Sequence, residues 1–167
     1  MKKNLQISII LLSCLLSANL FSADILTQKN IGLEAANDVA KMTIDACRKD
    51  GYNVSAVVVD KHGNIRSVMR DDLAAKFTID IAQRKANLVI MSGIASGEFK
   101  AARADIQQEM NNIDGLIMMK GGLPIRVAGV LIGAVGVSGA PGSEKDEACA
   151  AVAVKAISER LEFAGDE

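Results

Sequence analysis

The chain has 167 residues, which is enough for one domain of ordinary size, and 50% of them are hydrophobic. It carries 19 basic and 20 acidic residues, no tryptophan and only 3% aromatic residues. With a charge so close to neutral, and neither a basic stripe nor an aromatic platform, the sequence excludes the common kinds of nucleic-acid-binding surface.

Residues 1–23 have the pattern of a secretory signal peptide. Lys2 and Lys3 precede an apolar run, and Ser22-Ala23 supplies small residues for a cleavage site. We expect cleavage after Ala23 and a single mature domain over 24–167, located in the periplasm or secreted. Loss of the two lysines lowers the basic residues from 19 to 17 against 20 acidic ones, a net charge of −3. A retained membrane anchor is the alternative, although the run is short for a membrane span.

The first half of the chain has the pattern of a helix, a hairpin and a second helix. Between residues 27 and 50, apolar residues recur every three or four positions, which predicts a helix. A β-branched run at 54–59, turn residues at 60–64 and a second apolar run at 65–69 predict a β-hairpin. Helical spacing then predicts a helix over about 74–91.

The second half predicts a more polar helix over 96–110 and a short apolar strand at 116–119. The glycine-rich stretch 121–143 carries Val and Ile at strand spacing and supplies two further strands. Ser143 has the features of an N-cap for a last helix. The resulting order is one helix, two strands, two helices, three strands and one helix. It predicts an α/β (α+β) domain with an antiparallel sheet packed by helices.

Cysteine is sparse in the mature domain. Cys14 lies in the signal segment, so Cys47 and Cys149 remain. Each lies on the apolar face of a predicted helix, where cysteine often acts as a small hydrophobic residue. We expect unpaired core thiols, with a disulfide as the alternative in an exported protein.

Few residues are suited to catalysis. His62 is the single histidine and lies in the predicted hairpin turn, where a solvated turn residue is the ordinary interpretation. Two helical cysteines and one distant histidine lack the spacing of a zinc site. The sequence also lacks a phosphate-binding loop and an evident pair of nucleophile and base. An enzyme is therefore the least favoured class.

Two short segments could bind a ligand. Arg70, Asp71 and Asp72 fall where a strand ends and a helix begins, so the carboxylates either cap that helix or serve a site. The planar guanidinium of Arg70 matches a carboxylate. At Lys120-Gly121-Gly122, the glycines either form a simple turn or let the backbone approach a ligand closely.

Three motifs in order give the chain a family resemblance. They are the hairpin VVVDKHGNIRSVMRDD, the later AQRKAN, and the tail GGLPIRVAGVLIGAVGVSGA followed by an aspartate that opens the last helix. With these motifs the chain resembles the GlcG/HbpS-like family from about residue 27 to 163. The resemblance implies a profilin- or PAS-like fold with a five-stranded antiparallel sheet, and homo-oligomers that are often octamers. Some members bind haem or are described as promoting its degradation, and others accompany glycolate, propanediol or cobalamin metabolism.

From this resemblance we expect an exported, homo-oligomeric haem (tetrapyrrole)-binding protein, a carrier or an accessory sensor. The cations Arg70, Lys85 and Lys120 would lie near the haem propionates, and His62 is the first candidate for an axial ligand. Methionine sulfur or an oxygen ligand such as Thr78 stays open. The alternative is an accessory protein that binds a small organic acid or a partner such as a sensor protein, without haem. A haem-degrading enzyme is less favoured. The full set of candidate ligand residues is Arg70, Asp71, Lys85, Lys120, Gly121, Gly122 and Ser138.

Overall fold

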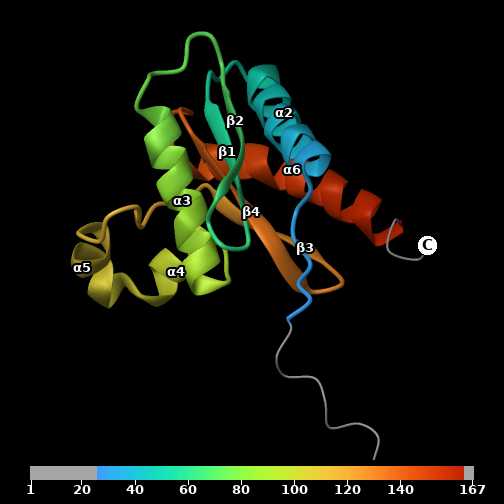
Figure 1. The fold of residues 1–167 in the computed structure, drawn as a ribbon. Coiled ribbons are helices and arrows are strands. Elements are labelled where there is room, and N and C mark those ends of the chain that lie inside the picture. Colours follow the sequence, from blue (N-terminus) through green and yellow to red (C-terminus); the bar gives the residue numbers. More distant parts are fainter. Residues whose placement is uncertain (1–25, 164–167) are drawn as a thin grey trace, which may run out of the picture.

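The computed structural model describes residues 26–163, which form an antiparallel sheet with helices on both faces (Figure 1). The four strands are ordered β2-β1-β4-β3. This architecture confirms the predicted α/β class. No helix in the described range is both long and apolar enough to cross a bilayer. The elements, in chain order, are α2 (Leu33–Lys49), β1 (Ser55–Asp60), β2 (Ile65–Arg70), α3 (Thr78–Ser92), α4 (Ser96–Ala102), the 3₁₀ helix η2 (Ala104–Ile106), α5 (Gln107–Asn111), β3 (Gly122–Val127), β4 (Val130–Ser138) and α6 (Ser143–Phe163).

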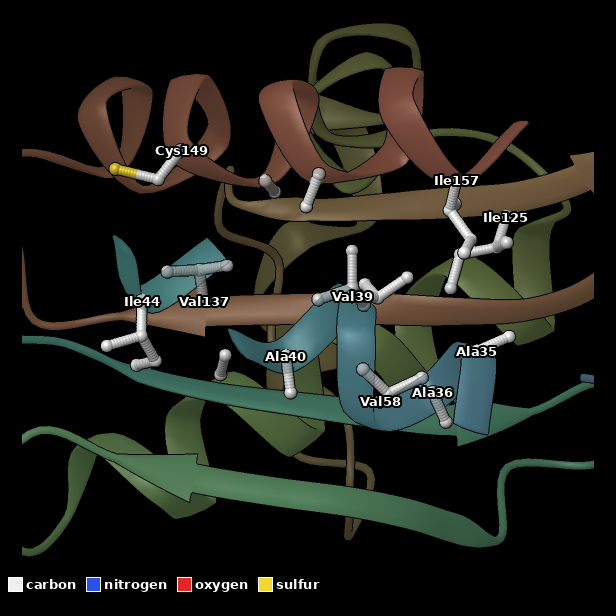
Figure 2. Packing of buried hydrophobic residues seen from close by; sticks show 14 of the residues in the cluster. Ala35, Ala36, Val39, Ala40, Ile44, Val58, Ile125, Val137, Cys149 and Ile157 are labelled. Atoms are coloured by element: carbon white, nitrogen blue, oxygen red, sulfur yellow. The ribbon is translucent and has the colours of Figure 1, made fainter. Parts of the chain in front are cut away.

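The central strands β1 and β4 are buried on both faces. Ala56 and Val58 of β1 pack against α2 and α6, while Val57 and Val59 point the other way and pack against α3. Figure 2 shows the first of these two cores, where side chains of α2 and α6 meet over the central strands. The continuous β-branched run of β1 therefore has no polar face because both of its faces are covered.

The sheet has one strand fewer than the sequence predicted. Leu116–Met119 was expected to be a strand, but it lies outside the sheet. Met118 is instead buried in a small cluster with Leu88 and Met110, and its N–H donates to the Asn111 side chain at 2.7 Å. An apolar run this short is consistent with a strand or with an irregular segment that buries its side chains. Here the segment is irregular, and Met118 packs against Leu88 of α3.

Helix limits also differ from the sequence pattern. The first helix begins at Leu33 rather than near residue 27. The segment 74–77 forms turns, so α3 begins at Thr78. The predicted helix over 96–110 is broken into α4, η2 and α5. In each case apolar spacing continued beyond the residues that keep helical backbone hydrogen bonds.

Cys47 and Cys149 form a disulfide, contrary to the expected free thiols. The bond joins α2 to α6, and the two Cα atoms lie 5.3 Å apart, within the usual range for a disulfide. Both cysteines do lie on apolar helix faces, as predicted. Periodicity could not reveal that these two faces meet on the same side of the sheet.

Glycine in β4 brings helix α3 into direct contact with the strand backbone. A Cβ atom on Gly136 would lie 1.8 Å from the carbonyl oxygen of Ala82 and 2.9 Å from the backbone nitrogen of Ala86. Gly136 has no positive φ, so its requirement is space rather than conformation. The absence of a side chain at Gly136 is therefore what allows this close packing.

Gly136→Ala is expected to lower the free energy of unfolding by about 3 kcal/mol or more, because the added methyl group must displace the α3 backbone. Gly32→Ala is the matched control, since a Cβ there meets nothing within 4 Å. His62→Ala, in an exposed turn, should change stability by no more than about 0.5 kcal/mol. Urea unfolding of the three variants provides the measurement. Equal unfolding free energies for Gly136→Ala and Gly32→Ala would contradict the close-packing argument.

Reduction of the disulfide is expected to destabilise the protein by about 2–5 kcal/mol, because the bond closes a loop between cysteines 102 positions apart. Thermal unfolding with and without a reducing agent measures the effect. A Cys47→Ala/Cys149→Ala variant should unfold like the reduced protein and should not respond to the reducing agent. A response of the same size in that variant would show that the disulfide is not the cause.

Candidate functional site

One end of the sheet gathers most of the predicted ligand residues. The strand register places Arg70 of β2 beside Ser55 of β1, and Ser55 beside Ser138 of β4. The turn 120–122 adjoins the same end, because its middle residue accepts a backbone hydrogen bond from Val137 at 2.9 Å. Residues from three separate motifs therefore lie at this end of the sheet, with Arg70 on the β2 edge and Lys120 beside the β3 edge.

A buried ion pair lies at the centre of this region. Lys85 of α3 is fully buried, and its Nζ donates to Asp146 Oδ2 and to the Val137 carbonyl, each at 2.8 Å. Asp146 lies near the start of α6, and its Oδ1 accepts a hydrogen bond from the Ala140 N–H at 3.0 Å. One ammonium group thus joins α3, the end of β4 and the start of α6.

Burial and the neighbouring acidic residues have opposite effects on the pKa of Lys85. Burial lowers the pKa of Lys85 from its ordinary value of 10.5, while the hydrogen bond and charge of Asp146 and the charge of Glu147 oppose this shift. The position of Asp146 in the first turn of α6 also favours a negative charge. Because the Lys85 ammonium is enclosed and bonded inside the protein, it is not available to the ligand carboxylate that the sequence analysis placed near it.

The two glycines of the turn are required by close packing around this pair. Gly121 has φ +107°, and a Cβ there would lie 2.9 Å from Asp146 Cβ and 3.0 Å from Lys85 Nζ. A Cβ on Gly122 would lie 2.5 Å from the Lys85 carbonyl oxygen. The Gly122 N–H also donates to Ser96 Oγ at 2.9 Å. These contacts account for the glycine pair without a ligand.

Lys120 remains at the surface beside the buried pair. Its side chain lies over Gly97, where a Cβ would come within 2.8 Å of both Lys120 Cγ and Glu147 Oε2. Met119 next to it is 36% exposed. The surface formed by Met119 and Lys120, here called the Lys120 corner, therefore offers a thioether and a cation from adjacent residues, and both residues are accessible to a ligand.

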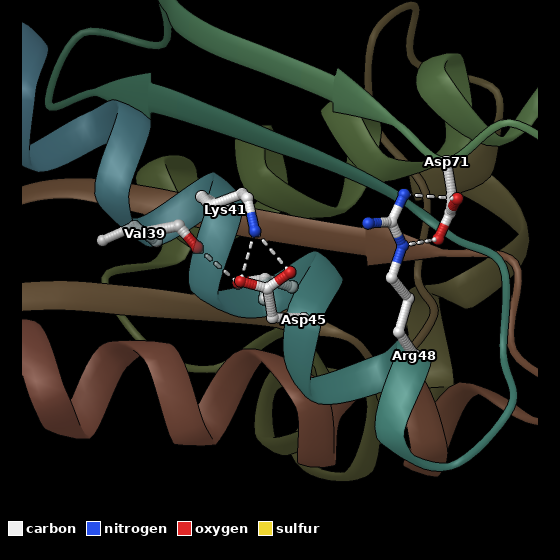
Figure 3. A network of polar contacts seen from close by, with 6 residues as sticks. Val39, Lys41, Asp45, Arg48 and Asp71 are labelled. Atoms are coloured by element: carbon white, nitrogen blue, oxygen red, sulfur yellow. Dashed lines mark hydrogen bonds and ion pairs between the residues drawn. The ribbon is translucent and has the colours of Figure 1, made fainter.

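Arg70 and Asp71 have different surroundings although they are adjacent. Asp71 is buried and accepts two hydrogen bonds from Arg48, at 2.7 Å from Nε and 2.8 Å from Nη2 (Figure 3). These bonds hold the pKa of Asp71 below its usual value, and burial only partly opposes them. Arg70 is exposed, and one of its nitrogens donates to the Ala74 carbonyl. Asp71 thus anchors α2, whereas Arg70 remains accessible.

Two further candidates are not accessible beside Arg70 and Lys120. Thr78 is turned inward, where its hydroxyl bonds to Ser55 Oγ at 2.8 Å and to the Ala75 carbonyl at 2.6 Å. His62 is exposed in the turn between β1 and β2, at the other end of β1 from Ser55. Its backbone N–H donates to the Asp60 carboxylate at 2.9 Å, which stabilises the turn. The structure does not bring the imidazole together with Arg70 or Lys120.

Sequence reasoning missed the partners that complete the region. Asp146 was noticed only as a helix-starting residue, because nothing local connects it to Lys85, 61 positions earlier. The sequence likewise offers no local sign that Arg48 binds Asp71 or that Ser96 binds the Gly122 N–H. An unpaired lysine within the apolar spacing of α3 was the one available signal, since a buried lysine requires a partner.

The fold agrees with the comparisons with known proteins. A family model described as "Haem degrading protein HbpS-like" matches residues 31–155. The chain belongs to the HbpS-like family. This membership confirms the resemblance found in the sequence motifs. The comparison with curated proteins gave no match.

Solved structures extend this result. A double mutant of HbpS from Streptomyces reticuli is 29% identical, with a TM-score of 0.74 over 83% of this chain and 94% of that one. The ORFY protein of Klebsiella pneumoniae is 28% identical, with a TM-score of 0.75 over 83% and 98% of the two chains. PduOC, solved as a heme complex, is 21% identical with a TM-score of 0.69 over 76% and 94%, and this likeness concerns the fold alone.

Asp146→Asn is expected to destabilise the protein by about 3–5 kcal/mol at neutral pH, because it leaves the buried Lys85 ammonium without its counterion. Without Asp146, desolvation lowers the folded-state pKa of Lys85 further below its unfolded value. The folded variant then sheds the proton while the unfolded chain still holds it, so the stability of the variant rises with pH. The loss relative to the unmodified protein should therefore shrink as pH is raised above neutral.

Denaturant unfolding across a pH series measures this loss. Asp105→Asn is the matched control, because it removes an exposed partner of Arg103 and should have little effect at any pH. A constant loss for Asp146→Asn at all pH values would contradict the role assigned to the Lys85 charge.

Proposed function

We propose that this protein is an exported, homo-oligomeric haem-binding protein that acts as a carrier or accessory sensor. The observation that carries the proposal is membership of a family described by haem degradation, together with about 28–29% identity to HbpS over nearly its whole length. The heme complex of PduOC supports it, because a chain of the same fold was solved with that ligand.

The accessible residues fit haem only in part within one chain. Arg70 and Lys120 are exposed cations at the polar end of the sheet, and Met119 adds a sulfur atom beside Lys120. The imidazole of His62 lies at the opposite end of β1. Two hollows of about 260 and 340 Å³ include none of these residues. Over residues 26–163, no cluster of three or more metal-ligating side chains occurs.

This separation favours a haem site that a second copy completes. Surface cations of one copy would hold the propionates by charge-assisted hydrogen bonds, and a donor from a neighbouring copy would face the iron. Haem would supply the spectroscopic and redox chemistry, while the chain supplies the cations and the covering surface. Oligomerisation is thus part of the same proposal, and light scattering at micromolar concentration tests it.

Export is the second part of the proposal. The disulfide between Cys47 and Cys149 supports it, because such bonds persist mainly in oxidising compartments. The lysine pair and apolar run of residues 1–23 support it independently. The mass of the native protein should correspond to an N-terminus close to residue 24, and a full-length product would contradict export.

Titration with hemin is expected to give a defined Soret shift that saturates at a fixed ratio of haem to protein. Arg70→Ala or Lys120→Ala should weaken binding about ten- to a hundred-fold, because each removes a charge-assisted contact worth about 1.5–3 kcal/mol. Neither substitution should move the Soret maximum, since neither removes an iron ligand. His62→Ala or Met119→Leu should move the maximum if that side chain binds iron.

Lys155→Ala, on an exposed position of α6, is the matched control for loss of a surface cation. Metal-free protoporphyrin separates the contribution of iron from that of the propionates. Broadening without saturation would refute specific haem binding and would favour the small organic acid as the ligand.

A further inference from the structure

The sheet has two edges, and they are not equivalent. The strand order β2-β1-β4-β3 leaves β2 and β3 at the outside (Figure 1). An edge strand carries backbone N–H and C=O groups that no neighbouring strand satisfies, so it can accept a strand from another chain unless something blocks it.

The β3 edge is blocked along its length. Pro124 has no N–H to offer, and the Gly122 N–H is already bonded to Ser96 Oγ at 2.9 Å. The Arg126 side chain also donates hydrogen bonds to the carbonyls of Gly93 and Gly129, which places a charged residue on this strand. Each of these features is a known protection of a sheet edge against strand addition.

Along the C-terminal half of the β2 edge, no proline removes an N–H group and no bond from the described residues takes one up. The Asp71 N–H donates to the Val54 carbonyl at 2.9 Å, which fixes the hydrogen-bond phase between β1 and β2. In that phase, Arg70 and Val68 stand opposite Ser55 and Val57 as pairs that share no hydrogen bond. Their own N–H and C=O groups therefore point away from β1, toward the free edge. No backbone partner for these groups occurs within the described part of the chain.

The side chains at this edge are apolar and basic. Val68 is 41% exposed, and Arg66 and Arg70 are exposed on either side of it. In the loop that follows, Asp71 is bound to Arg48 and Asp72 is exposed. The edge itself is positively charged.

This charge disfavours a second copy of the same chain. A two-fold antiparallel pairing centred on Val68 would place Arg66 of one copy opposite Arg70 of the other. A pairing centred on Met69 would place the two Arg70 side chains on a diagonal across the pair. Like charges at these distances destabilise a strand pair, whereas opposite charges stabilise it.

We propose that the β2 edge binds an extended, acidic segment of another protein, which adds to the sheet as a fifth strand. Val68 and Arg70 would supply the backbone hydrogen bonds, and Arg66 and Arg70 would select carboxylates on the added strand. This mode of recognition takes affinity from main-chain bonds and specificity from alternate side chains. The proposal does not depend on haem binding.

The probe is a capped peptide, Thr-Glu-Thr-Val-Thr-Glu-Thr, which places a valine opposite Val68 and glutamates near both arginines. Binding is followed by amide NMR of the intact mature protein. The amide protons of Val68 and Arg70 should shift and exchange more slowly in the complex. Those of Ser67 and Met69 already face β1 and should change little. Replacing both glutamates by lysine should weaken binding about tenfold or more.

Two variants test the backbone and the charge separately. Val68→Pro removes an N–H that faces the edge and not β1, so it should abolish binding while the protein keeps its fold. The double variant Arg66→Glu/Arg70→Glu should lose the acidic peptide and gain the lysine peptide, an exchange that misfolding would not produce. Binding that ignores peptide charge, protection spread over both sets of amides, or self-association through this edge in light scattering would overturn the proposal.

Discussion

The contact between the α3 backbone and the β4 backbone determines where everything else in this fold can lie. A helix normally stands off a sheet by the thickness of two side chains, but Gly136 and Gly122 remove one of these layers. Helix α3 can then pack low enough on the sheet for the Lys85 side chain to reach past the strand to the Val137 carbonyl and to Asp146. The ion pair is thus a consequence of the close packing as much as a stabilising contact in its own right.

The buried pair also shows how a polar group can specify an arrangement. A lysine with no solvent has to find an acceptor, and here the acceptors come from a strand end and from the start of the last helix. Any alternative placement of α6 would leave the ammonium without a counterion, at a cost of several kcal/mol. The pair therefore selects one docking of α6, and the Lys120 corner is positioned as a by-product of that selection.

The sequence was most informative where chemistry is local. The hairpin, the glycine-rich strands and the last helix could be predicted because turn residues, β-branched runs and capping residues act within a few positions. The strand predicted at Leu116–Met119 was wrong because four apolar residues suit a strand or a buried irregular segment equally well. The sequence did not predict the partner of Lys85 or the pairing of Cys47 with Cys149 for another reason. Both depend on segments that meet only in the folded state, and their meeting has no local signature in the sequence.

The disulfide has a consequence for the order in which the molecule can be completed. Cys149 follows Cys47 by 102 positions and lies in α6, so the covalent link cannot close until α6 has been made. The central pairing of β1 with β4 is also long-range, because it needs residues 133–138. A growing chain can form the hairpin and α3 early, but its core stays open on the α2 side until α6 arrives. During that interval the apolar face of α2 is exposed, which makes the incomplete chain prone to aggregation.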